Sequence, residues 1–390
     1  MNAKRILIFF SLKPLCLLCL HSMIKFCNQL VNWYRLNARD LPWRNTRNPY
    51  HIWISEIIFQ QTRIDQGFNY WRRFIDRFPS VEQLANAEEQ EVLHIWQGLG
   101  YYSRARNMHL AAKQIMFEFG GAFPDTYEQI IRLKGVGTYT AAAVSSIAFG
   151  ERQVVVDGNV LRFLSRLAGI TEPIDTNRVK KIIGDLALSL LEDADPGTFN
   201  QALMEFGALY CVPRNPDCVN CIFKDICKAY AMDAIKEIPF KSKKVIVRKR
   251  YFNYLFLYTE DKDKQRSFLL QRRGEGDIWH GLYECPMIED TTLLDPDALT
   301  TTGLWQNDIM IHQPILSSHQ EDFVHQLTHQ QLHTRFFMVL LQNVIIEKLR
   351  PEWILVPETN FHTYPVSRLI NKFLNTFIDK KNDISFHSAF

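Results

Sequence analysis

Four cysteines gathered within a short stretch constrain the folding of this chain most strongly. They follow the spacing C-x6-C-x2-C-x5-C and are Cys211, Cys218, Cys221 and Cys227. Four thiolates so close in sequence can surround one soft metal centre, because the x2 pair supplies adjacent ligands and the longer gaps wrap the chain around it. Zinc or a pair of disulfides are the alternatives, and disulfides fit worst with a chain of otherwise intracellular character.

The size and composition of the chain indicate a folded protein with substantial cores. It has 390 residues, of which 47% are hydrophobic, and this length favours two or three domains. These values exclude a disordered or fibrous protein. The net charge of +3 leaves a nucleic-acid partner open, because a DNA site can occupy one basic face of a nearly neutral protein.

The hydrophobic pattern divides the chain into a helical domain, a linker and an α/β domain. Apolar residues recur at three- and four-residue spacings through 23–234, which predicts helices throughout. Residues 235–250 are rich in lysine and arginine, and this charge makes them a candidate linker and docking segment for a sliding clamp. Aromatic and β-branched runs in 251–380 predict strands of a small α/β domain.

The first 22 residues have some features of a signal peptide. Lys4 and Arg5 precede an apolar stretch, but Pro14 interrupts it and no small-x-small cleavage site follows. We interpret 1–22 as an extension from a start codon placed too early, with Met23 as the alternative start. No run of about 20 apolar residues is present, so no membrane partner is expected.

A glycine-containing turn in 133–141 is a candidate DNA contact. Gly135 and Gly137 precede a helix of small residues, TAAAVSSIAF. Glycine allows positive φ and close approach of backbone amides to an anion, so this hairpin can hold a phosphate without contacting a base. An ordinary turn between helices is the alternative.

Two carboxylates lie in different settings, which would let one act as a proton-donating acid and the other as an anion that stabilises positive charge. Glu56 lies among isoleucines and a tryptophan in IWISEIIFQQT, which predicts a raised pKa. Asp157 follows an apolar VVV run and precedes Gly158. A surface glutamate and a helix N-cap are the respective alternatives.

The cysteine spacing, the hairpin string and SEIIFQQT together resemble the MutY family of helix-hairpin-helix base-excision glycosylases over nearly the whole chain. The resemblance implies one 4Fe-4S cluster on the four cysteines. It also implies excision of adenine opposite 8-oxoguanine or G in double-stranded DNA. Glu56 would protonate adenine at N7, and Asp157 would stabilise or capture the oxocarbenium ion. Asn159 would position Asp157, and Tyr139 would support the same site.

Tyr139 also bears on strand cleavage. Bifunctional relatives carry a lysine at this place, and its amine forms a Schiff base with the sugar. Tyrosine cannot form that imine, and Lys134 precedes the hairpin. We therefore expect a glycosylase without strong lyase activity.

Excision of a base from a duplex requires the base to be flipped out into a pocket. By resemblance, Gln61 and Tyr101 insert at the lesion, while Trp43, Arg44 and Gln201 line the adenine pocket. Each aromatic residue could instead belong to a core.

The segment DIWHGLYE in the second domain resembles the Nudix-like C-terminal domain of the MutY family. No R-E-x-x-E-E stretch follows Gly281, so we expect recognition of the opposite base, 8-oxoguanine, rather than pyrophosphate hydrolysis. The family's Phe-Ser-His motif corresponds here to Leu327-Thr328-His329. Threonine keeps the hydroxyl for hydrogen bonding, whereas leucine lacks the stacking ring.

The predicted protein is thus a mainly α glycosylase domain, with a six-helix part and an iron-sulfur part, followed by a Nudix-like α/β domain. We expect a monomer in the DNA-containing cytoplasm of a bacterium. The alternatives are an endonuclease III-like enzyme acting on oxidised pyrimidines, a non-catalytic DNA-binding or redox-sensing iron-sulfur protein, and a nucleotide hydrolase.

Overall fold

A computed structural model describes residues 17–242 and 247–379, and these residues form two compact units. The first unit combines the segments before and including Gln61 with Lys113–Lys243, and the second combines Thr62–Ala112 with the chain from Lys244 onward. Most of the predicted extension 1–22 and part of the basic linker, including 243–246, lie outside the described residues.

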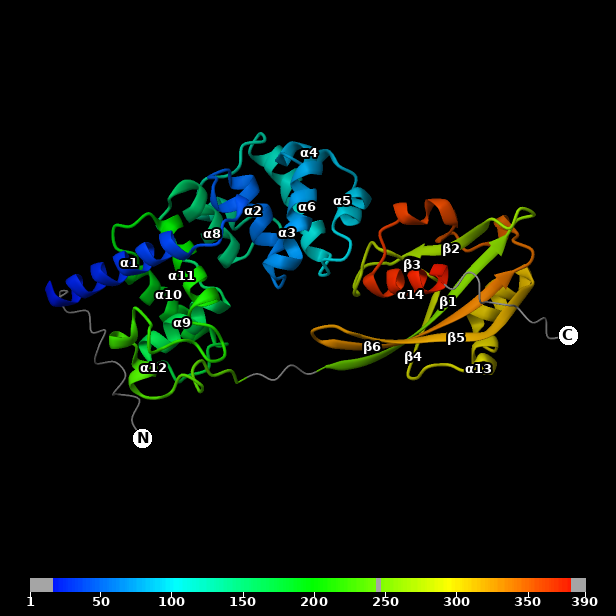
Figure 1. Cartoon of the computed structure of the whole chain (residues 1–390). Coiled ribbons are helices and arrows are strands. Elements are labelled where there is room, and N and C mark those ends of the chain that lie inside the picture. Colours follow the sequence, from blue (N-terminus) through cyan, green and yellow to red (C-terminus); the bar gives the residue numbers. More distant parts are fainter. Residues whose placement is uncertain (1–16, 243–246, 380–390) are drawn as a thin grey trace. The chain divides into compact units, whose positions relative to one another are not determined.

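Helices make up the first unit (Figure 1). Its core holds Phe26, Phe163, Phe206 and Phe223, which lie far apart in sequence and stack on one another. In chain order the elements are α1 (Leu17–Asn37), η1 (Pro42–Arg44), α2 (Pro49–Ile58), α7 (Tyr127–Ile130), α8 (Thr138–Phe149), α9 (Gly158–Ala168), α10 (Asn177–Leu191), α11 (Pro196–Leu209), η2 (Lys224–Ile226) and α12 (Lys228–Ala231).

Close packing of α11 on α9 depends on one glycine. A Cβ built on Gly207 would lie 2.7 Å from the backbone oxygen of Asn159, so a larger residue would force the two helices apart. This contact brings the residues of α11 beside the N-terminus of α9, where the candidate catalytic residues lie.

The second unit begins with four helices, the last of which continues into the first unit. They are α3 (Ile64–Arg77), α4 (Val81–Asn86), α5 (Glu89–Ile95) and α6 (Ser103–Glu118).

A seven-stranded sheet forms the C-terminal part of the second unit. The strands are β1 (Arg248–Glu260), β2 (Arg266–Arg272), β3 (Tyr283–Glu284), β4 (Met287–Asp290), β5 (Pro314–Gln326), β6 (Gln330–Leu341) and β7 (Trp353–Pro357). The path is β3-β2-β1-β6-β5, with β4 paired to β1 and β7 to β2. The central β1–β6 pair is parallel and the other pairs are antiparallel.

Two hydrophobic clusters cover the two faces of this sheet. Phe256 of β1 packs in the cluster that includes α14 (Arg368–Asp379), and the next residue, Leu257, packs in the cluster beside α13 (Pro296–Thr300) (Figure 1). Alternation along β1 therefore places consecutive side chains on opposite faces. The predicted order, helices followed by an α/β domain, is confirmed.

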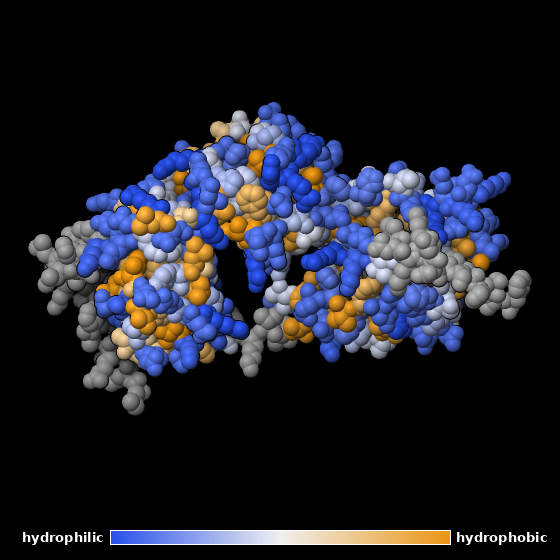
Figure 2. Space-filling view, viewed as in Figure 1, coloured by the Kyte–Doolittle hydropathy of each residue, from blue (hydrophilic) through white to orange (hydrophobic). Residues whose placement is uncertain are grey.

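On the face that Figure 2 shows, the surface is largely hydrophilic, with smaller hydrophobic patches. In the part of the chain that the structure describes, no helix combines the length and apolar character needed to cross a bilayer. Helix α1 begins at Leu17, before residue 23, where the predicted helical domain starts.

Candidate active site

Glu56 lies on α2 in surroundings that favour its neutral form. Pro49 begins this helix, and the side chain of Asn48 caps it by accepting from the backbone N–H groups of Tyr50 and His51. The apolar residues of the helix are buried. Burial raises the pKa of Glu56 to about 7 from an ordinary value of 4.5. The predicted direction of this shift is confirmed.

Tyr139, the second residue of α8, contacts Glu56 directly. Its hydroxyl donates to Glu56 Oε2 at 2.5 Å and lies 3.6 Å from the sulfur of Met204. Burial raises the pKa of Tyr139 well above 10, and the negative charge near it acts in the same direction. The phenol therefore keeps its proton and serves as a donor.

Asp157 is both the N-cap of α9 and a neighbour of this pair. Its carboxylate accepts from the backbone N–H groups of Asn159 at 2.9 Å and Val160 at 2.7 Å. It interacts electrostatically with Glu56 and Tyr139. Burial raises the pKa of Asp157, while these hydrogen bonds oppose the shift. The cap and a catalytic role are compatible, because the cap holds the carboxylate in place.

Asn159 links Asp157 to the cysteine loop. Its side-chain amide donates to Asp157 Oδ2 at 2.7 Å, and its oxygen accepts from Arg162 Nη2 at 2.9 Å. Arg162 also donates through Nε to the backbone oxygen of Cys211 at 2.8 Å. A chain of three hydrogen bonds thus runs from a candidate catalytic carboxylate to a candidate cluster ligand.

Arg44 and Gln201 lie in a polar network beside this group. Gln201 accepts from the hydroxyl of Tyr34 at 2.7 Å, and Arg44 donates to both oxygens of Glu205 at 2.8 and 2.6 Å. Arg39 contacts the same carboxylate. Despite its burial, these partners lower the pKa of Glu205 to about 2.

Glu205 and its partner Arg39 were not predicted from the sequence. The available signal was a glutamate four residues after Gln201 in an apolar helix, since residues four apart share a helical face. Trp43 is buried and packs against Phe59, with ring centroids 4.6 Å apart. The ring of Trp43 therefore makes a core contact, next to the polar network that contains Arg44 and Glu205.

Gln61 and Tyr101 share an unusual backbone conformation. Their φ angles are 60° and 48°, and both side chains are exposed. Left-handed φ is strained for residues other than glycine, and such strain gathers at functional sites. They belong to different units, Gln61 to the first and Tyr101 to the second.

The glycine hairpin follows the predicted geometry. Gly135 has a φ of +74°, which favours glycine, and Gly137 caps the N-terminus of α8. The first N–H groups of a helix have no partner within the helix. Exposed Gly135 and Gly137 therefore leave the start of α8 open to an anion.

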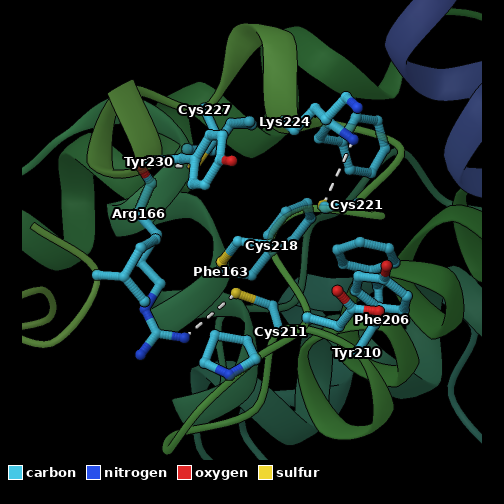
Figure 3. Close-up of a pocket in the computed structure, with 15 residues that line it drawn as sticks. Phe163, Arg166, Phe206, Tyr210, Cys211, Cys218, Cys221, Lys224, Cys227 and Tyr230 are labelled. Atoms are coloured by element: carbon cyan, nitrogen blue, oxygen red, sulfur yellow. Dashed lines mark hydrogen bonds between the residues drawn. The ribbon is translucent and has the colours of Figure 1, made fainter. Parts of the chain in front are cut away.

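Four cysteines line a single pocket of the first unit (Figure 3). Cys211, Cys218, Cys221 and Cys227 are free thiols in this structure, which contradicts the disulfide alternative. Aromatic rings, including Phe163, Phe206 and Tyr210, line the same pocket. Arg166 Nη1 lies 3.5 Å from the sulfur of Cys211, as the dashed line in Figure 3 indicates.

The thiols of Cys218, Cys221 and Cys227 are partly buried, and this burial raises their pKa values and opposes ionisation. Burial, together with the neighbouring thiolates, raises the pKa of Cys221 to about 11, so four thiolates need a positive partner. Cys27 and Cys285 are buried in the hydrophobic clusters and pack as small core residues.

Thr328 and His329 lie in the second unit at the turn between β5 and β6, and both are exposed. They line a pocket with Tyr101, Trp279 and Leu327. The hydroxyl groups of Thr328 and Tyr101 are hydrogen-bonded. After Gly281 the chain forms β3 and β4. The absence of pyrophosphatase chemistry stays a prediction.

Comparisons with known proteins agree with this arrangement. Residues 54–187 match the HhH-GPD superfamily base excision DNA repair proteins, and residues 256–376 match the NUDIX domain. The adenine DNA glycosylase of Buchnera aphidicola subsp. Baizongia pistaciae is 33% identical over 324 residues, covering 82% of this chain and 88% of that protein. The chain belongs to the adenine DNA glycosylase family.

Other similar proteins match only part of the chain. The adenine DNA glycosylase of Mus musculus is 42% identical over 214 residues, which are 53% of this chain and 42% of the mouse protein. A solved thermostable thymine-DNA glycosylase is 29% identical and superimposes with a TM-score of 0.51, covering 54% of this chain and 98% of its own. The helical domain is therefore shared with glycosylases that differ in the base named.

Proposed function

We propose that this protein excises adenine from double-stranded DNA by acid-assisted hydrolysis of the N-glycosidic bond. The observation that carries the proposal is the pairing of Glu56 with Tyr139 beside Asp157. A carboxyl group with a pKa of about 7 is poised to give up a proton near neutral pH. A second carboxylate held by hydrogen bonds is suited to stabilise positive charge on the sugar.

The hydrogen bond from Tyr139 assigns the two oxygens of Glu56 different roles. Oε2 accepts from the phenol, so the proton of the neutral acid belongs on Oε1. From there it passes to N7 of the flipped adenine, and the base leaves as a better leaving group. Asp157 then faces the oxocarbenium ion. Water adds to C1′ directly, or it displaces the carboxylate of Asp157 after that carboxylate has captured C1′. In both routes the water gives one proton to a carboxylate of the site, and the products are adenine and an abasic sugar.

The adenine pocket is proposed to include Trp43, Arg44 and Gln201. Arg44 donates to Glu205 and Gln201 accepts from Tyr34, so each side chain is held before the base enters, and the guanidinium of Arg44 lies over the ring of Tyr34. The strained backbones of Gln61 and Tyr101 suit residues that insert into the DNA duplex at the place that the flipped base vacates. Gly135 and Gly137 are proposed to hold a backbone phosphate at the start of α8.

The four cysteines are proposed to hold one 4Fe-4S cluster. Their sulfurs are soft ligands in an aromatic-lined pocket, which suits iron-sulfur coordination. When bound, the cluster supplies a cross-link of the loop from Cys211 to Cys227. The chain's own residues then order the neighbouring Asn159 through Arg162.

Recognition of the base opposite adenine is assigned to the pocket that contains Thr328 and His329. 8-oxoguanine carries a C8 carbonyl and an N7 hydrogen that guanine lacks. The hydroxyl of Thr328 can donate to the C8 carbonyl or accept from the N7 hydrogen, whereas guanine offers it only the N7 acceptor, so the contacts available to the two bases differ.

A single-turnover assay tests the proposed activity. Duplexes contain A opposite 8-oxoguanine, A opposite G, or an oxidised pyrimidine, and cleavage is measured with and without alkali. We expect breaks only at adenine and only after alkali, because Tyr139 cannot form an imine. Breaks without alkali, or at the oxidised pyrimidine, would indicate an endonuclease III-like enzyme instead.

The pH dependence of the single-turnover rate tests the role of Glu56. The acid form is active, so the rate should fall about tenfold per pH unit above about 7. A rate that stays level from pH 6 to pH 9 would remove Glu56 as the proton donor.

A further inference from the structure

Trp279 has a backbone conformation that its residue type disfavours. Its φ angle is 60°, and it lines the same pocket of the second unit as Tyr101, whose φ angle is 48°. Bulky side chains in the left-handed region are rare and persist only where surrounding contacts hold them. Two such residues in one pocket mark it as a place where ring position matters.

A buried ion-pair network holds the segment before Trp279. Arg250 Nη1 and Nη2 each donate to Asp277 at 2.6 Å, and Arg273 Nη2 donates to Asp277 at 2.5 Å. Both arginines are less than one-tenth exposed. Asp277 in turn accepts from the backbone N–H of Ile278 at 2.7 Å.

Backbone contacts fix Trp279 on both sides. Arg273 Nε donates to the backbone oxygen of Ile278 at 2.7 Å, directly before Trp279. The oxygen of Trp279 accepts from the N–H of Leu282 at 3.0 Å. Hydrogen bonds from within the domain therefore hold the backbone of Trp279 in its strained conformation.

The same network reaches the turn that carries Thr328. Arg250 Nη1 also donates to the side chain of Gln330 at 3.1 Å, two residues after Thr328. One guanidinium thus joins the segment 277–279 to the segment 328–330. This connection sets the spacing between the indole of Trp279 and the hydroxyl of Thr328.

The indole itself lies at the pocket wall. It is partly buried against the hydrophobic cluster that covers the α14 face of the sheet, as is Leu327. The imidazole of His325 packs edge-on against it, with centroids 5.8 Å apart and an angle of 63° between the rings. A rigid aromatic ring therefore stands beside an aliphatic Leu327, which cannot stack on a base.

We propose that Trp279 is a specificity-determining residue that stacks on the oxidised purine opposite the excised adenine. The inference rests on the proposed assignment of this pocket to the opposite base. Trp279 supplies the aromatic surface, Thr328 contacts the purine edge, and Arg250 and Arg273 keep the two at a fixed spacing. Trp279 takes the place of the ring that position 327 lacks.

Two substitutions separate the ring from the backbone strain. Trp279→Asn removes the ring but tolerates positive φ, since asparagine enters the left-handed region most readily after glycine. Trp279→Phe keeps a ring. Lys264→Asn is the matched control, because Lys264 has a φ of 58° in a hairpin turn of the same domain.

Binding is measured with the full-length protein and duplexes that cannot be cleaved. One strand carries a tetrahydrofuran abasic analogue in place of adenine, and the other carries 8-oxoguanine or a second tetrahydrofuran opposite it. We expect Trp279→Asn to weaken binding of the 8-oxoguanine duplex about tenfold or more, and to leave binding of the base-free duplex unchanged. Trp279→Phe and Lys264→Asn should both stay within about threefold of the unchanged protein.

The outcomes distinguish this inference from the proposed function. If the unchanged protein binds both duplexes equally, the assignment of the pocket to 8-oxoguanine fails. If it prefers 8-oxoguanine and Trp279→Asn keeps that preference, only the role of Trp279 fails. Equal losses on both duplexes would also overturn the inference, because they indicate a purely structural residue.

Tryptophan fluorescence gives a second test that does not depend on Trp279→Asn folding. The emission of Trp279 is obtained as the difference between the unchanged protein and Trp279→Phe. We expect the 8-oxoguanine duplex to quench this difference and the base-free duplex to leave it unchanged. Equal responses to the two duplexes would contradict stacking.

Discussion

The pKa values of two acidic side chains, one in each unit, are shifted in opposite directions. Glu56, in the first unit, lies among apolar residues and accepts from the neutral phenol of Tyr139, and its pKa is raised to about 7. Asp277, in the second unit, accepts from Arg250 and Arg273, and these partners hold its pKa well below the ordinary value. A neutral donor leaves a carboxyl group able to carry a proton, whereas arginine keeps it ionised. The arrangement around Glu56 suits proton donation, and the arrangement around Asp277 suits a structural ion pair.

The largest expected effect tests Glu56 as a proton donor. Glu56→Gln should slow adenine excision about 1,000-fold, because glutamine accepts the hydrogen bond from Tyr139 but has no acidic proton. Single-turnover rates on A opposite 8-oxoguanine measure the loss. Affinity for the same duplex should change little, and Glu128→Gln on α7 is the surface control. A rate within tenfold of the rate of the unchanged protein would contradict proton donation by Glu56, and with it the contrast between Glu56 and Asp277.

The next effect tests whether the ion pairs of Asp277 with its arginines stabilise the fold. Arg250→Met should lower the free energy of unfolding by about 3 kcal/mol, because it leaves Asp277 and Glu289 without their shared buried partner. Urea unfolding measures this value.

Arg335→Met is the matched control for Arg250→Met. It removes a more exposed bidentate pair with Asp322 and should cost less than about 1 kcal/mol. Equal costs for the two variants would show that burial of Arg250 contributes nothing.

A smaller effect, on the pH dependence of the free energy of unfolding, follows from the raised pKa of Glu56. The folded-state pKa lies above the ordinary value of 4.5, so the stability contributed by this group is complete below pH 4.5. It is lost as the pH rises through about 7. Glu56→Gln should therefore match the unchanged protein at pH 4.5 and exceed it by roughly 2 kcal/mol at pH 8.5. Thermal or urea unfolding at the two pH values measures the difference, and a difference that does not change with pH would contradict it.

The smallest effect concerns the neutral donor that holds Asp157. Asn159→Ala removes the amide that donates to Asp157 and accepts from Arg162, and should slow excision about tenfold. Thr198→Ala is the control, because the hydroxyl of Thr198 makes a similar bond to Asp195, the N-cap of α11. A loss in binding without a loss in rate would show that Asn159 orders the fold rather than the carboxylate.

Features that depend on neighbouring residues were predictable from the sequence. The raised pKa of Glu56 follows from the apolar residues around it on one short helix. The positive φ of Gly135, the cap at Asp157 and the grouping of four cysteines in one pocket are also local, since each involves residues close together in the chain. The order of helical and α/β domains follows from hydrophobic periodicity.

The tertiary structure decided which distant groups meet. Glu205 lies more than 150 residues from Arg39 and Arg44, and Asp277 and Gln330 meet at Arg250 from separate segments. Charged residues are common on surfaces, so no spacing in the chain distinguishes these from solvated ones. The left-handed backbone of Trp279 likewise depends on contacts from Arg273 and Leu282. The sequence by itself therefore determined the secondary-structure elements and the types of side chain available. Only the tertiary structure fixed which charges are neutralised, because Coulomb energies depend on distance and burial in space.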